Sequence, residues 1–262
     1  MGTTVYKVSL VEHSPRAGVI WSGTTQVRAR PWPHAPHKAF LLINGSHNPS
    51  ITLPEPTIVQ SWVSTLSSWG YSSVRTSALT PAASATLSLV GFSVAQELAL
   101  LEVDHRAIPT VALQPHFSLA RATRLARSVS QSRRTAILAL DQEAFGNEWA
   151  MDTATFTEAL CATRRVEIFL CHSPQQLVGF VIVGATGTNG FIQRLAVHPS
   201  ARRTGVASAL IATALAWSNR RGCTSTVVNT EVSNVAALGT YKKFGFIPLD
   251  NGLSVLEMTL SS

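Results

Sequence analysis

The chain has 262 residues, which allows one large domain or two of modest size. Hydrophobic residues make up 45% of it and charged residues only 13%, a balance that excludes an intrinsically disordered chain and a coiled coil. Lys and Arg number 21 against 14 Asp and Glu, so the formal net charge is +7. That charge favours an acidic partner, such as a phosphorylated cofactor, nucleic acid or a membrane surface.

The first fourteen residues contain no apolar run of the kind that a secretory signal needs, and no stretch approaches the ~18 apolar residues of a membrane span. The three cysteines are widely spaced and odd in number, so they predict neither a zinc site nor a disulfide framework: Cys161, Cys171 and Cys223. We therefore expect a reduced, cytoplasmic, soluble protein with no metal and no membrane contact.

A repeat is visible when the two halves of the chain are compared. The pairs Gly91-Phe92 and Gly245-Phe246 are each followed by an L-x-x-L-E strand, at 98–102 and at 253–257. An amphipathic stretch that ends in glycine precedes each pair, and corresponding positions are offset by 152 to 155 residues. Three matches at nearly constant offset indicate a duplicated domain. The alternative is two unrelated α/β units.

A basic segment separates the two halves. Residues 116–136 contain five arginines and no acid, and Arg121, Arg124 and Arg127 follow at three-residue spacing. In a helix they would share one face, which predicts a solvated helix between the domains. The alternative is a polyanion site, but no aromatic side chain is interleaved as nucleic-acid binding favours.

The second half predicts alternating helices and strands. Asp152 is a good cap for the second of its helices. Periodicity indicates helices over 135–146, 153–162, 205–220 and 234–244, and strands over 166–170, 177–184, 190–197, 223–229 and 253–260. This order predicts an α/β or α+β domain with a mixed sheet.

A short basic loop joins the strand ending at Val197 to the helix beginning near Gly205. Free N–H groups at a helix N-terminus carry a partial positive charge of roughly +0.5, and a glycine lets a ligand approach the backbone. The loop and first turn therefore suit a pyrophosphate, although they match neither a P-loop nor a dinucleotide fingerprint. These residues are Arg202, Arg203, Thr204, Gly205, Val206 and Ala207.

A second motif, NVAALGTYKKFGF, begins at Asn234. On a helix, Asn234, Ala237 and Tyr241 share one face, and Asn234 is also a fair cap. Considered alone, Tyr241 is better interpreted as a core aromatic with its hydroxyl bonded to the backbone.

Taken together, R-x-x-G-x-A after a strand ending L-x-V-x-P, and N-x-x-A-x-x-x-Y-x-x-x-G-F further on, resemble the GCN5-related N-acetyltransferases (GNAT). The resemblance covers residues from about 135 to 260. The first half resembles a degenerate copy, because residues 47–56 hold prolines where the arginine–glycine loop should stand. We therefore expect a degenerate GNAT-like domain at 1–115, a basic linker or helix at 116–134 and an acetyl-CoA-binding GNAT domain at 135–262.

The resemblance implies an acyl-CoA-dependent N-acyltransferase that moves an acetyl group from acetyl-CoA to an amine of a small molecule or protein. The pantetheine arm would pair with the backbone of Leu195, Ala196 and Val197, and an N–H there would stabilise the oxyanion. The pyrophosphate would lie on residues 202–207, and Asn234 would face the co-substrate. Tyr241 would protonate the departing thiolate.

The general base is the weakest part of the resemblance. Relatives place an acid where this chain has Asn229, and the nearest acid is Glu231. We expect Glu231 to be the base and Asp141, Glu143 and Glu148 to lie near the acceptor cleft. Two alternatives remain open: acetylation of a cysteinyl amine, as by mycothiol synthase, and a non-catalytic protein that binds acetyl-CoA.

Overall fold

The structure is a computed structural model that describes residues 16–23, 25–45, 52–105, 113–122 and 128–260. The first half of the chain contributes strands β1 (Gly18–Ser22), β2 (Gln26–Trp32), β3 (Ala35–Ile43), β4 (Ser73–Thr76) and β5 (Ser93–Asp104), with helices α1 (Pro56–Ser68) and α2 (Pro81–Ser88).

The second half contributes helices α3 (Gln131–Trp149), α4 (Thr153–Cys161), α5 (Val206–Arg220) and α6 (Val235–Lys243). Its strands are β6 (Ser118–Arg121), β7 (Arg165–His172), β8 (Leu177–Thr186), β9 (Asn189–Val197), β10 (Ser225–Glu231), β11 (Ile247–Pro248) and β12 (Leu253–Thr259). The elements predicted for this half are confirmed, and Asp152 caps α4 by accepting the Thr155 N–H at 2.6 Å.

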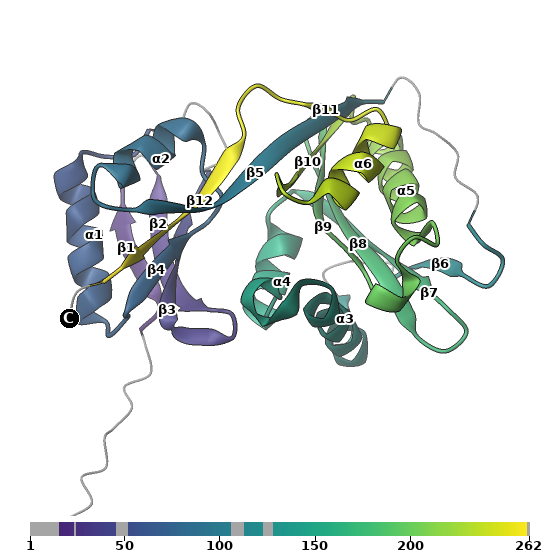
Figure 1. Cartoon of the computed structure of the whole chain (residues 1–262), viewed down its shortest axis with the longest axis horizontal. Helices are drawn as coiled ribbons and strands as arrows, with labels where there is room; N and C mark the ends of the chain where they lie inside the picture. Colours follow the sequence, from purple (N-terminus) through teal and green to yellow (C-terminus); the bar gives the residue numbers. More distant parts are fainter. Residues whose placement is uncertain (1–15, 24, 46–51, 106–112, 123–127, 261–262) are drawn as a thin grey trace, which may run out of the picture.

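All strands join one mixed sheet in the order β1-β2-β3-β4-β12-β5-β10-β9-β8-β7-β6, and β11 pairs with β5. The halves exchange strands at its centre. The last strand of the first half, β5, pairs with β10, and the last strand of the second half, β12, lies between β4 and β5 (Figure 1). Each half therefore completes the sheet of the other.

Helices cover both faces of this sheet and enclose separate apolar clusters. In the first half, α1 and α2 cover one face, and the cluster beneath them includes Leu256 and Leu260 from the far end of the chain. In the second half, α5 and α6 bury one face around Leu210 and Tyr241. Helices α3 and α4 bury the opposite face around Phe156.

The two helices that the repeat brings into correspondence end in the same way. Gly91 and Gly245 both have positive φ, of 102° and 80°, and close α2 and α6 respectively. The same two backbone hydrogen bonds close each helix. In the first half, the Gly91 N–H donates to Ser88 O and the Phe92 N–H donates to Leu87 O. In the second half, the Gly245 N–H donates to Lys242 O and the Phe246 N–H donates to Tyr241 O. This correspondence places Leu87 where the second half has Tyr241.

The helix predicted for the basic segment is wrong at residues 118–121, whereas residues 131–136 form the start of α3. Ser118–Arg121 is the edge strand β6, antiparallel to β7, and the Ala122 N–H continues the pairing to Ile168 O at 2.9 Å. Pairing with the sheet edge satisfies backbone groups that spacing alone would assign to a helix. Arg124 and Arg127 lie outside the described residues, and the domain boundaries stay a prediction. Within the described ranges, no helix combines the length and apolar character that crossing a membrane requires.

Candidate active site

An opening in the sheet lies between β9 and β10. These strands are parallel, and residues 189–192 of β9 pair with residues 225–228 of β10. The pairing stops after Ile192 and Val228. Strand β9 continues to Val197 on β8, while β10 continues to Glu231 on β5. The facing edges past Ile192 and Val228 therefore have no strand partner in the described structure. A ligand with amide groups could add there as a strand does.

A β-bulge lies at the mouth of this opening. Ile182 of β8 is opposite Arg194 and Val183 is opposite Ile192, so Gln193 is the extra residue of β9. The bulge places the Gln193 and Arg194 side chains on the α3–α4 side, since Gln193 donates to Thr163 Oγ1 at 3.2 Å. Beyond it, Leu195 and Val197 pack with the cluster under α5 and α6, whereas Ala196 belongs to the α3–α4 cluster.

The loop before α5 presents backbone donors. Arg203 and Gly205 have positive φ of 63° and 88°, and Gly205 caps α5 without a side-chain hydrogen bond. Across the described part of the chain, no acceptor is found for the N–H groups of residues 203–207. Thr204 closes the turn by donating its hydroxyl to Ala201 O at 2.7 Å. Free donors, a helix N-terminus and two exposed arginines suit a diphosphate.

The two arginines of this loop differ in what they contact. Arg202 donates to Ala144 O of α3 at 3.2 Å, so its side chain ties the loop to that helix. Arg203 is exposed, and no contact to it is found within the described residues. Val206 is buried and packs under the loop against β8, where Gly179 leaves room for it.

Tyr241 is buried against the same cluster as Leu195 and Val197. Its ring meets Phe246 edge-on, with centroids 5.2 Å apart. Burial raises the pKa of Tyr241 well above its ordinary value, so the hydroxyl keeps its proton. A protonated hydroxyl in this cluster is suited to giving a proton to a leaving group.

Glu231 and Asn234 lie at the end of β10. Glu231 is exposed, and its carbonyl accepts the Asn234 N–H at 2.9 Å. The Asn234 side chain caps α6 by accepting the Ala237 N–H at 3.1 Å, as predicted for a cap. Because side chains alternate along β10 and Val228 packs toward α6, the Glu231 carboxylate lies on the sheet face opposite Tyr241.

Two of the acids expected near the acceptor cleft are already paired. Asp141 is fully buried and binds Arg194 through both carboxylate oxygens, at 2.7 and 2.8 Å. Glu148 forms an ion pair with Arg75 of the first half at 3.0 Å. Glu143 is exposed on α3. Among the described side chains, no group of three His, Cys, Asp or Glu gathers as a metal site requires.

The corresponding place in the first half is closed. Strands β3 and β4 pair through Leu41 and Thr76, and the pairing continues beyond them: Ser77 N–H donates to Leu41 O at 2.9 Å. The Ser77 hydroxyl then accepts the Ile43 N–H at 3.5 Å. Leu87 also stands where the second half has Tyr241, so the described residues of this half have neither the opening nor a hydroxyl at that position.

Comparison with known proteins agrees with this geometry. The profile of the Acetyltransferase (GNAT) family matches residues 134–246. Residues 134–246 are a GNAT-family domain. The whole chain resembles a GCN5-related N-acetyltransferase from Kribbella flavida, at 13% identity over 94% of this chain and 90% of that one, with a TM-score of 0.64. It also resembles a tandem GNAT protein from the clavulanic acid biosynthesis pathway, at 12% identity over 91% and 79%, with a TM-score of 0.62.

At these identities the solved structures show the fold alone, and it agrees with the predicted tandem GNAT fold. A curated relative is an aminoglycoside N(6')-acetyltransferase type 1 of Klebsiella aerogenes. It is 38% identical over 61 residues, 23% of this chain and 40% of that protein. The match thus covers less than half of that relative's length.

Sequence reasoning missed the role of the bulge and of Arg194. The signal was present as two adjacent polar residues, Gln193 and Arg194, inside an otherwise apolar strand. In a regular strand such neighbours point to opposite faces, so one of them would enter an apolar cluster. A bulge is the local structure that places both on one face.

Proposed function

We propose that this GNAT protein is an acetyl-CoA-dependent N-acetyltransferase with one active centre, in its second half. The observation that carries the proposal is the opening between β9 and β10 beside the unpaired donors of residues 203–207. The first half has no such opening, because Ser77 closes it. The residues in the second half fit a ligand with an extended amide arm and a diphosphate.

In this proposal the backbone of Leu195, Ala196 and Val197 binds the pantetheine arm as an added strand. The N–H groups of Arg203, Thr204, Gly205, Val206 and Ala207 hold the pyrophosphate, with the charge of Arg202 and Arg203 beside it. Asn234 supports this side by fixing the start of α6, since its side-chain oxygen is committed to the cap.

The reaction is a direct transfer. The amine nitrogen of the acceptor bonds to the thioester carbonyl carbon, and the bond from that carbon to sulfur breaks. A backbone N–H near Leu195 stabilises the negative charge on the carbonyl oxygen, a contribution worth about 10²–10³ in rate in other enzymes. Tyr241 gives its proton to the thiolate, and Glu231 accepts the proton that the amine loses.

The positions of the two proton-transfer groups support this assignment. Tyr241 lies on the α5–α6 face of the sheet and Glu231 on the α3–α4 face, with the opening between them. An acceptor that enters from the α3–α4 side would attack from the face opposite the departing sulfur. Asp141 and Glu148 are already paired, and of the exposed acids Glu143 and Glu231, Glu231 lies on β10, the strand that borders the opening.

The acceptor is proposed as a class, a primary amine. The partial match to an aminoglycoside acetyltransferase makes kanamycin a reasonable first probe, and spermidine and a cysteinyl amine extend the panel. Thiol release from acetyl-CoA with each amine would report turnover. Binding of acetyl-CoA with no turnover on any amine would favour the non-catalytic alternative.

The binding step has its own test. Acetyl-CoA should raise the melting temperature of the wild-type protein, and the double variant Arg202→Glu/Arg203→Glu should abolish that shift because it reverses two charges beside the diphosphate. Arg220→Glu is the matched control, since it reverses an exposed charge at the other end of α5. A wild-type protein that shows no shift would sink the proposed function.

A further inference from the structure

Helices α3 and α4 of the catalytic half cover the sheet of the other half as well. Within its described residues the first half has no helices of its own on that face. The Trp32 indole N–H of β2 donates to Glu148 O at 3.0 Å. Arg30, also on β2, forms an ion pair with Glu158 of α4 at 2.8 Å. The corner between α3 and α4 is therefore held from the first half.

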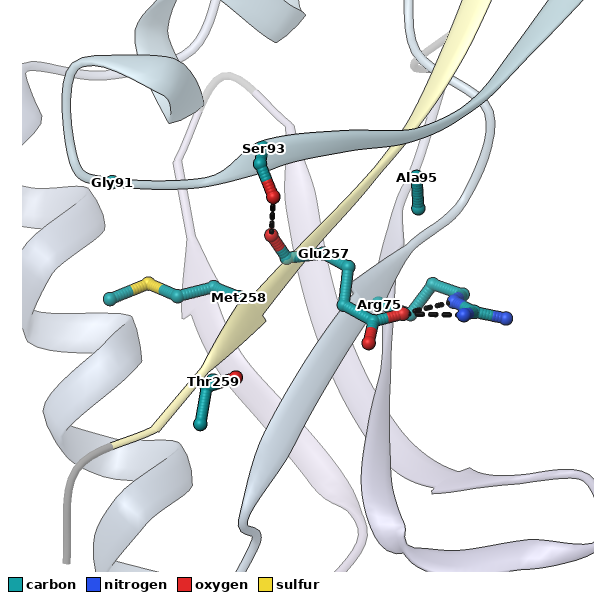
Figure 2. A pocket seen from close by; sticks show the side chains of 7 residues that line it. All are labelled: Arg75, Gly91, Ser93, Ala95, Glu257, Met258 and Thr259. Atoms are coloured by element: carbon teal, nitrogen blue, oxygen red, sulfur yellow. Dashed lines mark hydrogen bonds and ion pairs between the residues drawn. The ribbon is translucent and has the colours of Figure 1, made fainter.

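Arg75 is the centre of this contact. It is 6% exposed, and its guanidinium lies over two indole rings, 5.0 Å from the centre of Trp32 and 4.7 Å from that of Trp149. It binds Glu257 of β12, Nε to Oε2 at 2.6 Å, and Glu148 of α3 at 3.0 Å. Arg75 and Glu257 are among the residues that line a pocket of about 550 Å³, and Figure 2 shows the ion pair between their side chains. One planar cation thus joins β4, β12 and the end of α3.

The same corner is bonded to β9 on its other side. Trp149 O accepts a hydrogen bond from Arg194 Nη2 at 2.8 Å. Asp141, which pairs with Arg194, also accepts the Met151 N–H at 2.7 Å. The Arg194 guanidinium lies 3.6 Å from the centre of the Phe145 ring. Gly146, with a φ of 72°, turns the chain between these contacts.

A continuous set of contacts therefore runs from Arg75 through Glu148 and Trp149 to Arg194. Arg194 directly follows the bulge residue Gln193 and directly precedes Leu195. These two neighbours define where the first free N–H groups of β9 lie. A shift of the corner would move Arg194, and with it the strand that faces the opening.

We propose that Arg75 is a positioning residue for acetyl transfer, through which the degenerate half holds the α3–α4 corner and the β9 strand of the active half. The role in catalysis rests on the proposed function, whereas the mechanical link does not. The first half then acts as a brace for the centre that the second half contains. Loss of Arg75 would slow transfer more than it weakens the binding of acetyl-CoA, because no hydrogen bond or ion pair in the described structure joins the pyrophosphate loop at 203–207 to Arg75 or Glu148.

The test measures backbone hydrogen exchange in peptides spanning residues 145–152 and 190–198, with α5 as the folding reference. Arg75→Met and Glu148→Gln should each speed exchange about tenfold in both peptides, since they free the corner from opposite sides. Arg75→Lys should give exchange rates between those of the wild type and Arg75→Met, because lysine keeps the positive charge but lacks the planar guanidinium. Lys38→Met is the matched control: it removes the other cation of Glu257, 3.1 Å away, and no hydrogen bond or ion pair joins Lys38 to α3 in the described structure.

Turnover adds the functional readout. With the best amine of the panel, Arg75→Met should lower kcat about tenfold and raise the acetyl-CoA Kd by less, because the pyrophosphate loop keeps its contacts while the β9 strand shifts. Two results would overturn the proposal. In the first, Arg75→Met speeds hydrogen exchange in peptide 145–152 but leaves exchange in peptide 190–198 unchanged. In the second, Lys38→Met speeds exchange in both peptides as much as Arg75→Met does. If Arg75→Met does not fold, Glu148→Gln decides, because that side chain is 62% exposed. If the wild-type protein does not bind acetyl-CoA, the proposed function is contradicted. The exchange experiment would still test whether Arg75 connects the first half to β9.

Discussion

At the scale of single residues, the two copies differ at the position that closes α2 and α6. Tyr241 and Leu87 each accept the closing hydrogen bond of a helix followed by Gly-Phe, and both side chains are buried. The surroundings therefore fit a large side chain in both halves, but only one copy has a hydroxyl. Packing explains a bulky residue at this position, and the hydroxyl of Tyr241 is left for chemistry.

Removing that hydroxyl should slow transfer and leave binding intact. Tyr241→Phe should lower kcat by about 10²-fold or more, within the usual range for a general acid, with the acetyl-CoA Kd unchanged. Burial raises the pKa of Tyr241, so the wild-type acid stays protonated and kcat should show no loss from it up to about pH 10. Kinetics from pH 6 to 10 would check this.

Tyr71→Phe is the control for that experiment. Tyr71 is equally buried, burial raises its pKa to about 12, and it donates to Arg16 O at 2.6 Å. It lies in the first half, so its loss should reduce stability by about 1 kcal/mol and leave kcat unchanged. Equal kcat for wild type and Tyr241→Phe would contradict the assignment of the acid.

At the scale of elements, the position of α5 depends on a glycine of the sheet. A Cβ on Gly179 of β8 would lie 2.8 Å from Val206 and 3.0 Å from Leu210, both on the buried face of α5. The helix thus rests directly on the backbone of the strand. Because Val206 is the first residue of α5, this contact also sets where the free N–H groups point.

Gly179→Ala should therefore weaken both stability and acetyl-CoA binding. Overpacking of this kind typically costs about 1–3 kcal/mol, and moving the start of α5 should raise the acetyl-CoA Kd. Gly239→Ala is the contrasting variant, since a Cβ there meets nothing within 4 Å inside α6 and should stabilise by about 0.5–1 kcal/mol. Urea unfolding would measure the effect on stability, and calorimetric titration with acetyl-CoA would measure the effect on binding. If Gly179→Ala is destabilised but binds acetyl-CoA with wild-type affinity, the position of α5 does not determine the position of the loop at 202–207.

At the scale of the whole molecule, the strand exchange makes the halves interdependent. Strand β10 has β5 as its neighbour, and β12 contributes Leu256 and Leu260 to the core under α1 and α2. A cut near residue 128 would expose the edge of β10 and leave β12 without partners. Exposed edges of this kind promote association.

We expect residues 128–262 expressed alone to be insoluble or aggregated, although they include the entire matched family segment. Co-expression with residues 1–127 should recover a soluble complex that unfolds in one transition. Solubility, light scattering and thermal unfolding would check this. A stable, monomeric fragment with a full acetyl-CoA shift would contradict the interdependence.

Much of the fold could be predicted from local signals. Asp152 as a cap, the glycines after α2 and α6, and the apolar periodicity of α5 all depend on residues a few positions apart. The loop at 202–207 and Asn234 were also found this way, since a strand, a glycine and a helix start are contiguous in sequence. The helix predicted for the basic segment was wrong because β6 forms by pairing with β7, some fifty residues away in the sequence.

The sequence by itself determined the composition of this protein, its helices, its duplication and the one copy that keeps the tyrosine and the arginine–glycine loop. The tertiary structure decided which strands are exchanged, where β9 bulges and which acids are free to act. Arg75 and Glu257 are 182 residues apart, and Arg194 and Asp141 are 53 apart. Caps and periodicity act over one or two turns of chain, whereas strand partners and buried ion pairs depend on which surfaces meet when the whole sheet closes.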